Sequence, residues 1–299
     1  MELRFTNLSA VLFASLVLVG CASAPPKSDV ALNAGGQINN AEALKGKKLP
    51  VSGMNVNLGV HLERLTLLSG EGHTGTKIAS GLMAGAASLA GVGGGTDFAS
   101  REPVEDHLTE ADAKKINADI VKILNSALQK AGVNTADSNT VISLPAYAKL
   151  KGETKLKTDT QMVKGKMFNP DYYFGLYQMP TAGYKYMSGG LLSDGPKDAA
   201  SAAMSGTGIP ASVDWEVDIV NDRKVMRVRN LTLRVWASNP SMFGNITAPQ
   251  LTISVNPDEI NVHSGESHKY LEYWKALSPK FEVAAKAMAE RLAFSLANK

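Results

Sequence analysis

Cysteine is almost absent from the sequence, since Cys21 is the only one in 299 residues. A lone cysteine cannot form an internal disulfide or supply a cysteine-based zinc site. Excess charge is also missing, because a formal net charge of +3 is too small to indicate nucleic-acid binding. We therefore expect the fold to be stabilised by apolar packing and by assembly of several copies.

Catalytic patterns are missing as well. The sequence has no nucleophile elbow, no metalloprotease helix and no close pair of carboxylates in an apolar setting. Residues Gly70 to Gly75 match the G-x-G-x-x-G pattern, with Asp97 further along. However, the preceding strand alternates polar and apolar residues, whereas the first strand of a dinucleotide-binding fold is apolar on both faces. We expect no enzymatic activity and no cofactor.

Histidines offer two weaker signals. His263, Glu266 and His268 could ligate a metal, but a polar turn before Tyr270 and Trp274 is the simpler explanation, and we expect no metal. His61 and Glu63 lie two residues apart on a predicted strand and face the same solvent-exposed side. That spacing favours a salt bridge over catalysis.

The N-terminus has the layout of a secretory signal. Arg4 precedes an apolar stretch from Ala10 to Val19, and small residues flank Cys21. Residues 1–20 are therefore predicted to be a signal peptide, too short to span a membrane permanently. The sequence Leu18-Val19-Gly20-Cys21 resembles the bacterial lipobox. That resemblance implies cleavage between Gly20 and Cys21, attachment of diacylglycerol to the Cys21 thiol, and acylation of the new N-terminus, for example with palmitate.

Such an anchor needs no membrane helix, because each buried methylene contributes about 0.8 kcal/mol. Ala22 follows the cysteine. In the sorting pattern of bacterial lipoproteins, an Asp at this position keeps the protein in the inner membrane, so Ala22 implies delivery to the outer membrane. Residues 21–52 are rich in Ala, Pro, Gly, Asn and Lys, which predicts a lipidated tether. Residues 53–299 are then expected to form the globular domain.

Alternating apolar residues predict strands at 56–62 and in a hairpin from 213 to 235 that turns at Asn221-Asp222. Further strands are expected at 141–144 and 172–177. A helix should begin after the cap Thr109 and end near Gly132. A second helix is expected to begin with Ser278 as cap and Pro279 as its first residue. These elements predict an α+β fold, a mostly antiparallel sheet with two amphipathic helices on one face.

Two glycine- and alanine-rich excursions interrupt this pattern. The insertion at 76–100 contains nineteen residues, Ile78 to Thr96, without a charge. Gly81 and Gly85 have the spacing that lets helices approach closely in lipid, and Leu82 and Leu89 add apolar surface. The sequence of this segment is compatible with two interpretations, a membrane or subunit contact and a flexible loop. The stretch 188–210 carries charges and is predicted to be a loop.

The C-terminal stretches resemble the end of the TraT family of outer-membrane lipoproteins; they are Ser264 to Tyr270, Phe281 to Ala284 and Leu292 to Asn298. The family resemblance implies a surface-exposed, ring-forming oligomer that hinders mating-pair contact and can confer complement resistance. A more remote resemblance, carried by Ala24 to Lys27 after the lipidated cysteine, is to the curli secretion channel lipoproteins.

Three hypotheses follow. The first is a non-enzymatic, homo-oligomeric outer-membrane lipoprotein with a surface or cell-contact role such as surface exclusion. The second is a transport pore or secretion accessory of the curli channel type. The third is a periplasmic scaffold that docks a cell-wall enzyme. All three take outer-membrane lipid as a partner, the third adds an envelope protein, and none involves nucleic acid.

Replacement of Cys21 by serine tests the first inference, because only the thiol can receive the diacylglycerol. We expect Cys21→Ser to abolish acylation, measured by incorporation of labelled palmitate, and to release the protein from the membrane fraction. Unchanged membrane retention would contradict the anchor.

Overall fold

The computed structural model describes residues 30–39, 41–62, 107–163, 172–188, 194–222, 224–241, 244–256, 259–263 and 269–297. It has an eight-stranded, mostly antiparallel sheet with helices packed on it. The predicted α+β class is therefore confirmed.

The strands are β1 (Leu32–Gly36), β2 (Val51–Leu62), β3 (Lys157–Val163), β4 (Tyr172–Met179), β5 (Ala211–Asp222), β6 (Val225–Ser241), β7 (Gly244–Val255) and β8 (Asn261–His263). Their order is β1-β7-β6-β5-β2-β4-β3, and β8 pairs with the start of β6. All neighbours are antiparallel except β2 and β5, which run parallel. The predicted hairpin is confirmed as β5 and β6, and the predicted aromatic strand as β4. The predicted turn at Asn221-Asp222 is wrong, because these two residues end β5 and pair with Met226 and Val225, so the chain turns after them.

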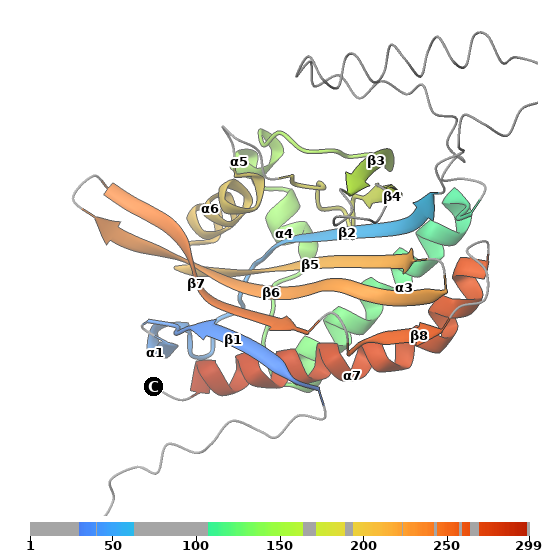
Figure 1. Ribbon diagram of the computed structural model, residues 1–299. Helices are drawn as coiled ribbons and strands as arrows, with labels where there is room; N and C mark the ends of the chain where they lie inside the picture. The colour runs from blue at the N-terminus through green and yellow to red at the C-terminus, as the bar shows by residue number, and fades with distance from the viewer. Residues whose placement is uncertain are drawn as a thin grey trace, which may run out of the picture.

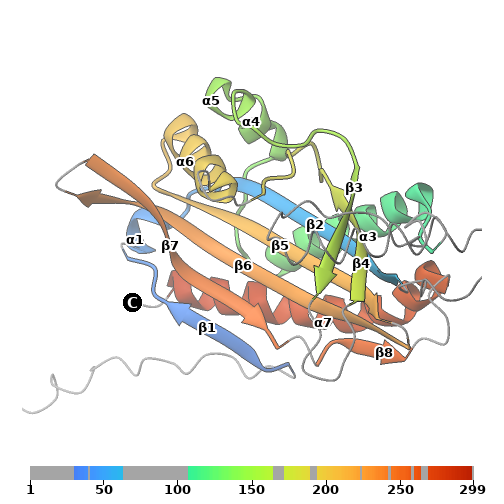
Figure 2. The same ribbon diagram turned by 45° about the horizontal axis from the view of Figure 1, so that its top comes forward.

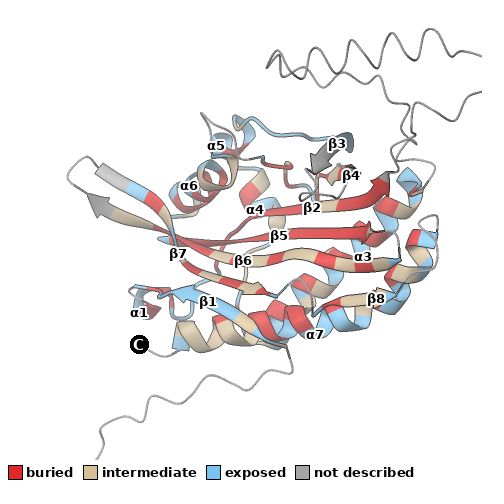
Figure 3. Cartoon of the chain, in the orientation of Figure 1, coloured by how far each residue is buried: buried red, intermediate tan, exposed pale blue. Residues whose placement is uncertain are grey.

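The helices are α1 (Ala41–Leu44), α3 (Glu110–Lys130), α4 (Ser138–Ile142), α5 (Pro145–Ala148), α6 (Gly195–Thr207) and α7 (Tyr270–Ala297). The long helices α3 and α7 lie together against one face of the sheet (Figure 1). The shorter α6 packs on the opposite face near one end of β5, with α4 and α5 beside it (Figure 2). Figure 3 shows the buried residues concentrated in the central strands and in the inner sides of α3 and α7.

Helix α3 follows from its local sequence. The Thr109 hydroxyl accepts a hydrogen bond from the backbone N–H of Asp112 at 3.1 Å, which satisfies one of the free donors of the first turn. Gly132 ends the helix with a φ of +77°, a conformation that glycine adopts without strain. The inner side, including Ile116, Ile120 and Leu124, is fully buried. The predicted cap and apolar stripe are both confirmed.

Helix α7 begins earlier than predicted. It starts at Tyr270 and passes through Pro279, so Ser278 is not its cap and Pro279 is not its first residue. An internal proline costs about 3 kcal/mol. Here Trp274, Leu277 and Phe281 form one buried stripe across the proline, and burial of such side chains contributes about 1.5 to 3 kcal/mol each. The packing outweighs the local break.

Two short segments also differ from expectation. Residues 141–144 are not a strand but lie in and just after α4, which Asp137 caps through the backbone N–H of Asn139 at 2.8 Å. A short apolar run cannot by itself distinguish the two structures. The predicted loop 188–210 contains helix α6. Asp194 caps it, Pro196 occupies its first turn and Gly208 ends it in the left-handed conformation, so residues that suggested a loop are helix-terminal signals.

The predicted tether is shorter than 21–52. Strand β1 pairs with β7, and α1 buries Ala41 and Leu44 against the core. Only Val30 and later residues of this stretch are described. The small, polar composition of residues 30–41 hid a strand whose partner lies more than two hundred residues away in the sequence.

A tight turn joins Thr181 to Tyr184, whose backbone groups exchange two hydrogen bonds at 3.3 and 2.9 Å. Its central residues, Ala182 and Gly183, have φ values of 52° and 86°. Positive φ at both positions is the type I′ geometry, which favours Asn-Gly. Ala182 is therefore strained, since the left-handed region costs an ordinary residue roughly 1 to 2 kcal/mol.

We expect Ala182→Asn to raise the free energy of unfolding by up to about 1 kcal/mol, measured by urea denaturation. Gly183→Ala is the opposing variant, because a Cβ there would lie 2.9 Å from the Ile142 Cδ1 as well as at positive φ. It should lower stability. A fall with Ala182→Asn would show that the turn has a different geometry.

Candidate functional site

The face of the sheet opposite α3 and α7 is unusually polar, and we call it the polar face. It arises because polar and apolar residues alternate along much of β2, β5 and β6, so that many of the polar residues point away from the core. These residues are Asn55, Asn57, Asp214, Glu216, Asp218, Arg234 and the polar edge of Trp236. The alternation of the hairpin predicts that this side faces solvent. Instead α6 and residues 184–188 cover much of it, and Asp214 is only 4% exposed.

Asp214 is the centre of the polar face. Both of its carboxylate oxygens accept hydrogen bonds from Arg234, the shortest at 2.6 Å, and Oδ1 also accepts from the Trp236 indole N–H at 2.7 Å. Arg234 in turn contacts Glu216 at 3.0 Å. Burial alone would lower the pKa of Arg234, but its bonds to Asp214 and the nearby carboxylates raise it. The guanidinium stays charged.

A second pair lies further along β5. Asp218 is buried and its Oδ2 is 2.9 Å from the Arg229 Nε. Burial raises the pKa of Asp218, and the charge of Arg229 opposes that rise only in part. At the end of the strand, Asp222 lies 3.0 Å from the Arg227 Nη2 and 3.6 Å from the His61 Nδ1. His61 is buried, so the prediction that it faces solvent is wrong, because β4 and β5 flank it.

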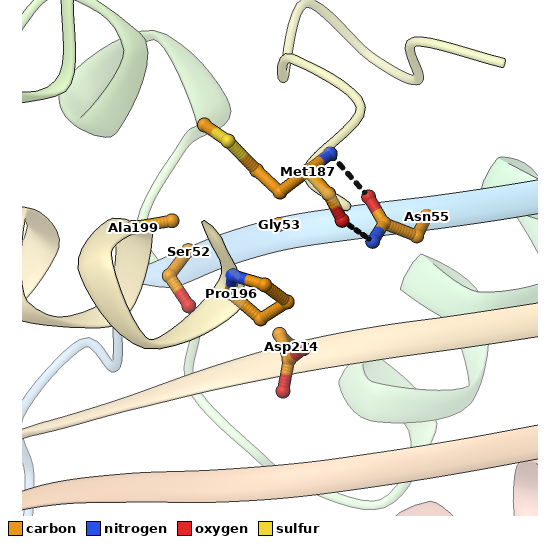
Figure 4. A pocket seen from close by; sticks show the side chains of 7 residues that line it. All are labelled: Ser52, Gly53, Asn55, Met187, Pro196, Ala199 and Asp214. Carbon is orange, nitrogen blue, oxygen red and sulfur yellow. Dashed lines mark hydrogen bonds between the residues drawn. The ribbon is translucent and has the colours of Figure 1, made fainter. Parts of the chain in front are cut away.

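Amide groups hold residues 184–188 on this face. The Asn55 side chain exchanges two hydrogen bonds with the backbone of Met187 (Figure 4). The Tyr186 hydroxyl donates to the Asn57 Oδ1 at 2.9 Å. Between this segment, Pro196 of α6 and Asp214 lies a cavity of about 10 Å³, which is the space of one water molecule.

The polar face pairs its buried charges internally, and one buried atom, Asp218 Oδ1, has no hydrogen-bond partner among the described residues. Each buried carboxylate has an arginine within hydrogen-bond distance, and the cavity beside Asp214 is too small for an organic substrate. Its chemical effect is to fix α6 and residues 184–188 to the sheet. The sequence analysis did not predict this cluster. The pattern that indicates it is the row of alternating acids on β5 beside arginines on β6.

Most residues singled out from the sequence lie outside the described residues. They are Gly20, Cys21, Glu63, Gly70 to Gly75, Gly81, Leu82, Gly85, Leu89, Asp97, Glu266 and His268. His263 lies in β8 and is exposed. Within the described ranges, no group of three or more His, Cys, Asp or Glu side chains is placed to hold a metal ion.

Comparisons of the chain with protein-family models, with curated proteins and with solved structures find no match. The fold and the polar face define an α+β domain whose mixed sheet has two long helices on one face and a shorter helix on the other. None of the helices in the part that the structure describes combines the length and apolarity needed to cross a bilayer.

Asp214→Asn should lower the free energy of unfolding by about 3 kcal/mol, because it removes the buried carboxylate and leaves the partly buried Arg234 with only Glu216. Glu282→Gln is the matched control. Its partner Lys130 is 3.5 Å away and both side chains are more than half exposed, so the loss should stay below about 1 kcal/mol. Chemical denaturation of both variants measures the difference, and equal losses would show that the Asp214 cluster contributes no more than a surface pair.

Proposed function

We propose that the protein is a lipid-anchored outer-membrane protein that is not an enzyme and acts, as a homo-oligomer, through its assembled surface in cell contact such as surface exclusion. The observation that carries this proposal is the lipobox Leu18 to Cys21 behind an export signal. The resemblance of the C-terminal stretches to the TraT family supports the cell-contact role.

The described charges support a role without catalysis. The carboxylates of the polar face pair with arginines of β6. Burial lowers the pKa of Arg234 by less than its carboxylate partners raise it, so the guanidinium remains a fixed cation rather than a proton donor. Such groups stabilise the fold and leave no proton-transfer group facing a substrate-sized space there.

The sheet edges support assembly. Strand β1 forms one edge and β3 the other. Residues 33–36 of β1 and 157–159 of β3 are exposed, and residues 30–41 carry no charge. An exposed edge without charges, such as β1, favours pairing with another chain, whereas β3 carries Lys157 and Asp159. Pairing of β1 in one copy with β3 in the next is a head-to-tail contact, which closes into a ring when the rotation permits.

Surface labelling of intact cells tests the cell-contact role. A membrane-impermeant amine reagent should label the protein in intact cells as strongly as after permeabilisation. A soluble periplasmic protein, labelled only after permeabilisation, is the control. If this protein behaves like that control, the surface-exclusion role is wrong, and recovery of a cell-wall enzyme with a crosslinker would then favour the periplasmic scaffold.

Disulfide crosslinking tests the assembly separately. We expect the double variant Asn33→Cys, Thr158→Cys to give a ladder of multimers under oxidation, because the two thiols lie on opposite edges. Each single variant should give at most dimers, and Lys130→Cys, exposed on α3, is the control for random collision. A double variant that stops at dimers would contradict head-to-tail assembly.

A further inference from the structure

A second hollow has a volume of about 390 Å³. It is lined by the second half of α3, the start of β2, residues 135–138 and the turn at 182–184. Its volume is within the range of small-molecule sites. It shares no residue with the small cavity beside Asp214. Its walls are mainly polar, with Met54 and Val51 of β2 as the apolar part.

Tyr184 lines this hollow. The residue is only 2% exposed, and its ring packs edge-on against Tyr147 with centroids 6.3 Å apart. The Tyr147 hydroxyl accepts a hydrogen bond from the backbone N–H of Lys185 at 3.3 Å. The Tyr184 hydroxyl forms no hydrogen bond with another described residue.

This hydroxyl is a neutral donor. Burial raises the pKa of Tyr184 well above its usual value, and Tyr147 and Asp137 raise it further. It therefore keeps its proton at physiological pH. A group in the hollow that accepts a hydrogen bond would provide the partner that the protein does not.

Two opposite charges also line the hollow. Lys48 and Asp137 are both exposed, and neither forms an ion pair with another described residue. One oxygen of Asp137 accepts the backbone N–H of Asn139. These two charges differ from those of the polar face, where each buried carboxylate has an arginine partner.

The turn that forms one wall is strained. Ala182 lines the hollow with its φ of 52°, and residues held in sparsely populated backbone conformations cluster at ligand sites. The conformation of this turn determines the position of Tyr184, its last residue.

We propose that this hollow binds a small zwitterion, an amino acid or short peptide with a free amine and a free carboxylate. Lys48 pairs with the carboxylate, Asp137 pairs with the ammonium group, and the Tyr184 hydroxyl donates a hydrogen bond to an oxygen of the ligand. The site requires neither lipidation nor assembly, so a test of ligand binding is independent of a test of the proposed function.

Titration calorimetry of the full mature chain in detergent with dialanine tests the proposal. Dialanine should bind saturably, and N-acetyl-dialanine amide, which has the same backbone but no charges, should not. Lys48→Gln, Asp137→Asn and Tyr184→Phe should each weaken binding about tenfold, as expected for loss of a hydrogen bond to a charged group. Lys47→Gln removes a neighbouring exposed charge that does not line the hollow and should leave binding unchanged.

Thermal unfolding separates a ligand role from a structural one. Because the Tyr184 hydroxyl has no partner in the described protein, Tyr184→Phe should weaken binding without lowering the melting temperature. A lower melting temperature with unchanged binding would assign the hydroxyl to the fold and overturn its role. Absence of saturable dialanine binding, or equal binding of the capped peptide, would overturn the zwitterion site.

Discussion

Strand β5 has both edges and both faces occupied, and the rest of the structure depends on this constraint. It pairs with β2 on one side and β6 on the other. Val213, Trp215 and Val217 are fully buried toward α3 and α7. On the other side of the strand Asp214 and Asp218 are buried, because α6 and residues 184–188 lie over much of that side. Each of these two acids therefore requires a cation from the neighbouring strand, and β6 supplies Arg234 and Arg229.

Much of this architecture could be predicted from local sequence. Alternation identified β2, β5 and β6, and the Thr109 cap identified the start of α3. The errors share a cause, namely that local composition is weak evidence when tertiary contacts decide. Residues 32–36 form a strand only because β7 lies beside them, and α7 continues through Pro279 because its buried stripe holds both halves. The alanines of α6 favour helix strongly, a signal that the nearby charges obscured.

The candidate sites were harder to predict because they depend on register and on distant segments. Counting back from the last pair of the hairpin, Asp222 with Val225, would place Asp214 opposite Leu233. A bulge between Asp218 and Ile219 shifts the pairing by one residue and brings Arg234 opposite Asp214, and such an irregularity has no firm local signature. The hollow near Tyr184 is assembled from four separate segments, so only the folded chain brings its charges together.

The position of β1 at the edge of the sheet also constrains the order in which the chain can fold. The backbone N–H of Ala31 donates to the Glu259 carboxylate across 228 residues, and β1 has β7 as its neighbour. Contacts this distant in sequence form slowly, because a long loop must close before they contribute any stability. Strand β1 can dock only after β7 is present, so the part of the domain that is synthesised first is among the last to reach its native place.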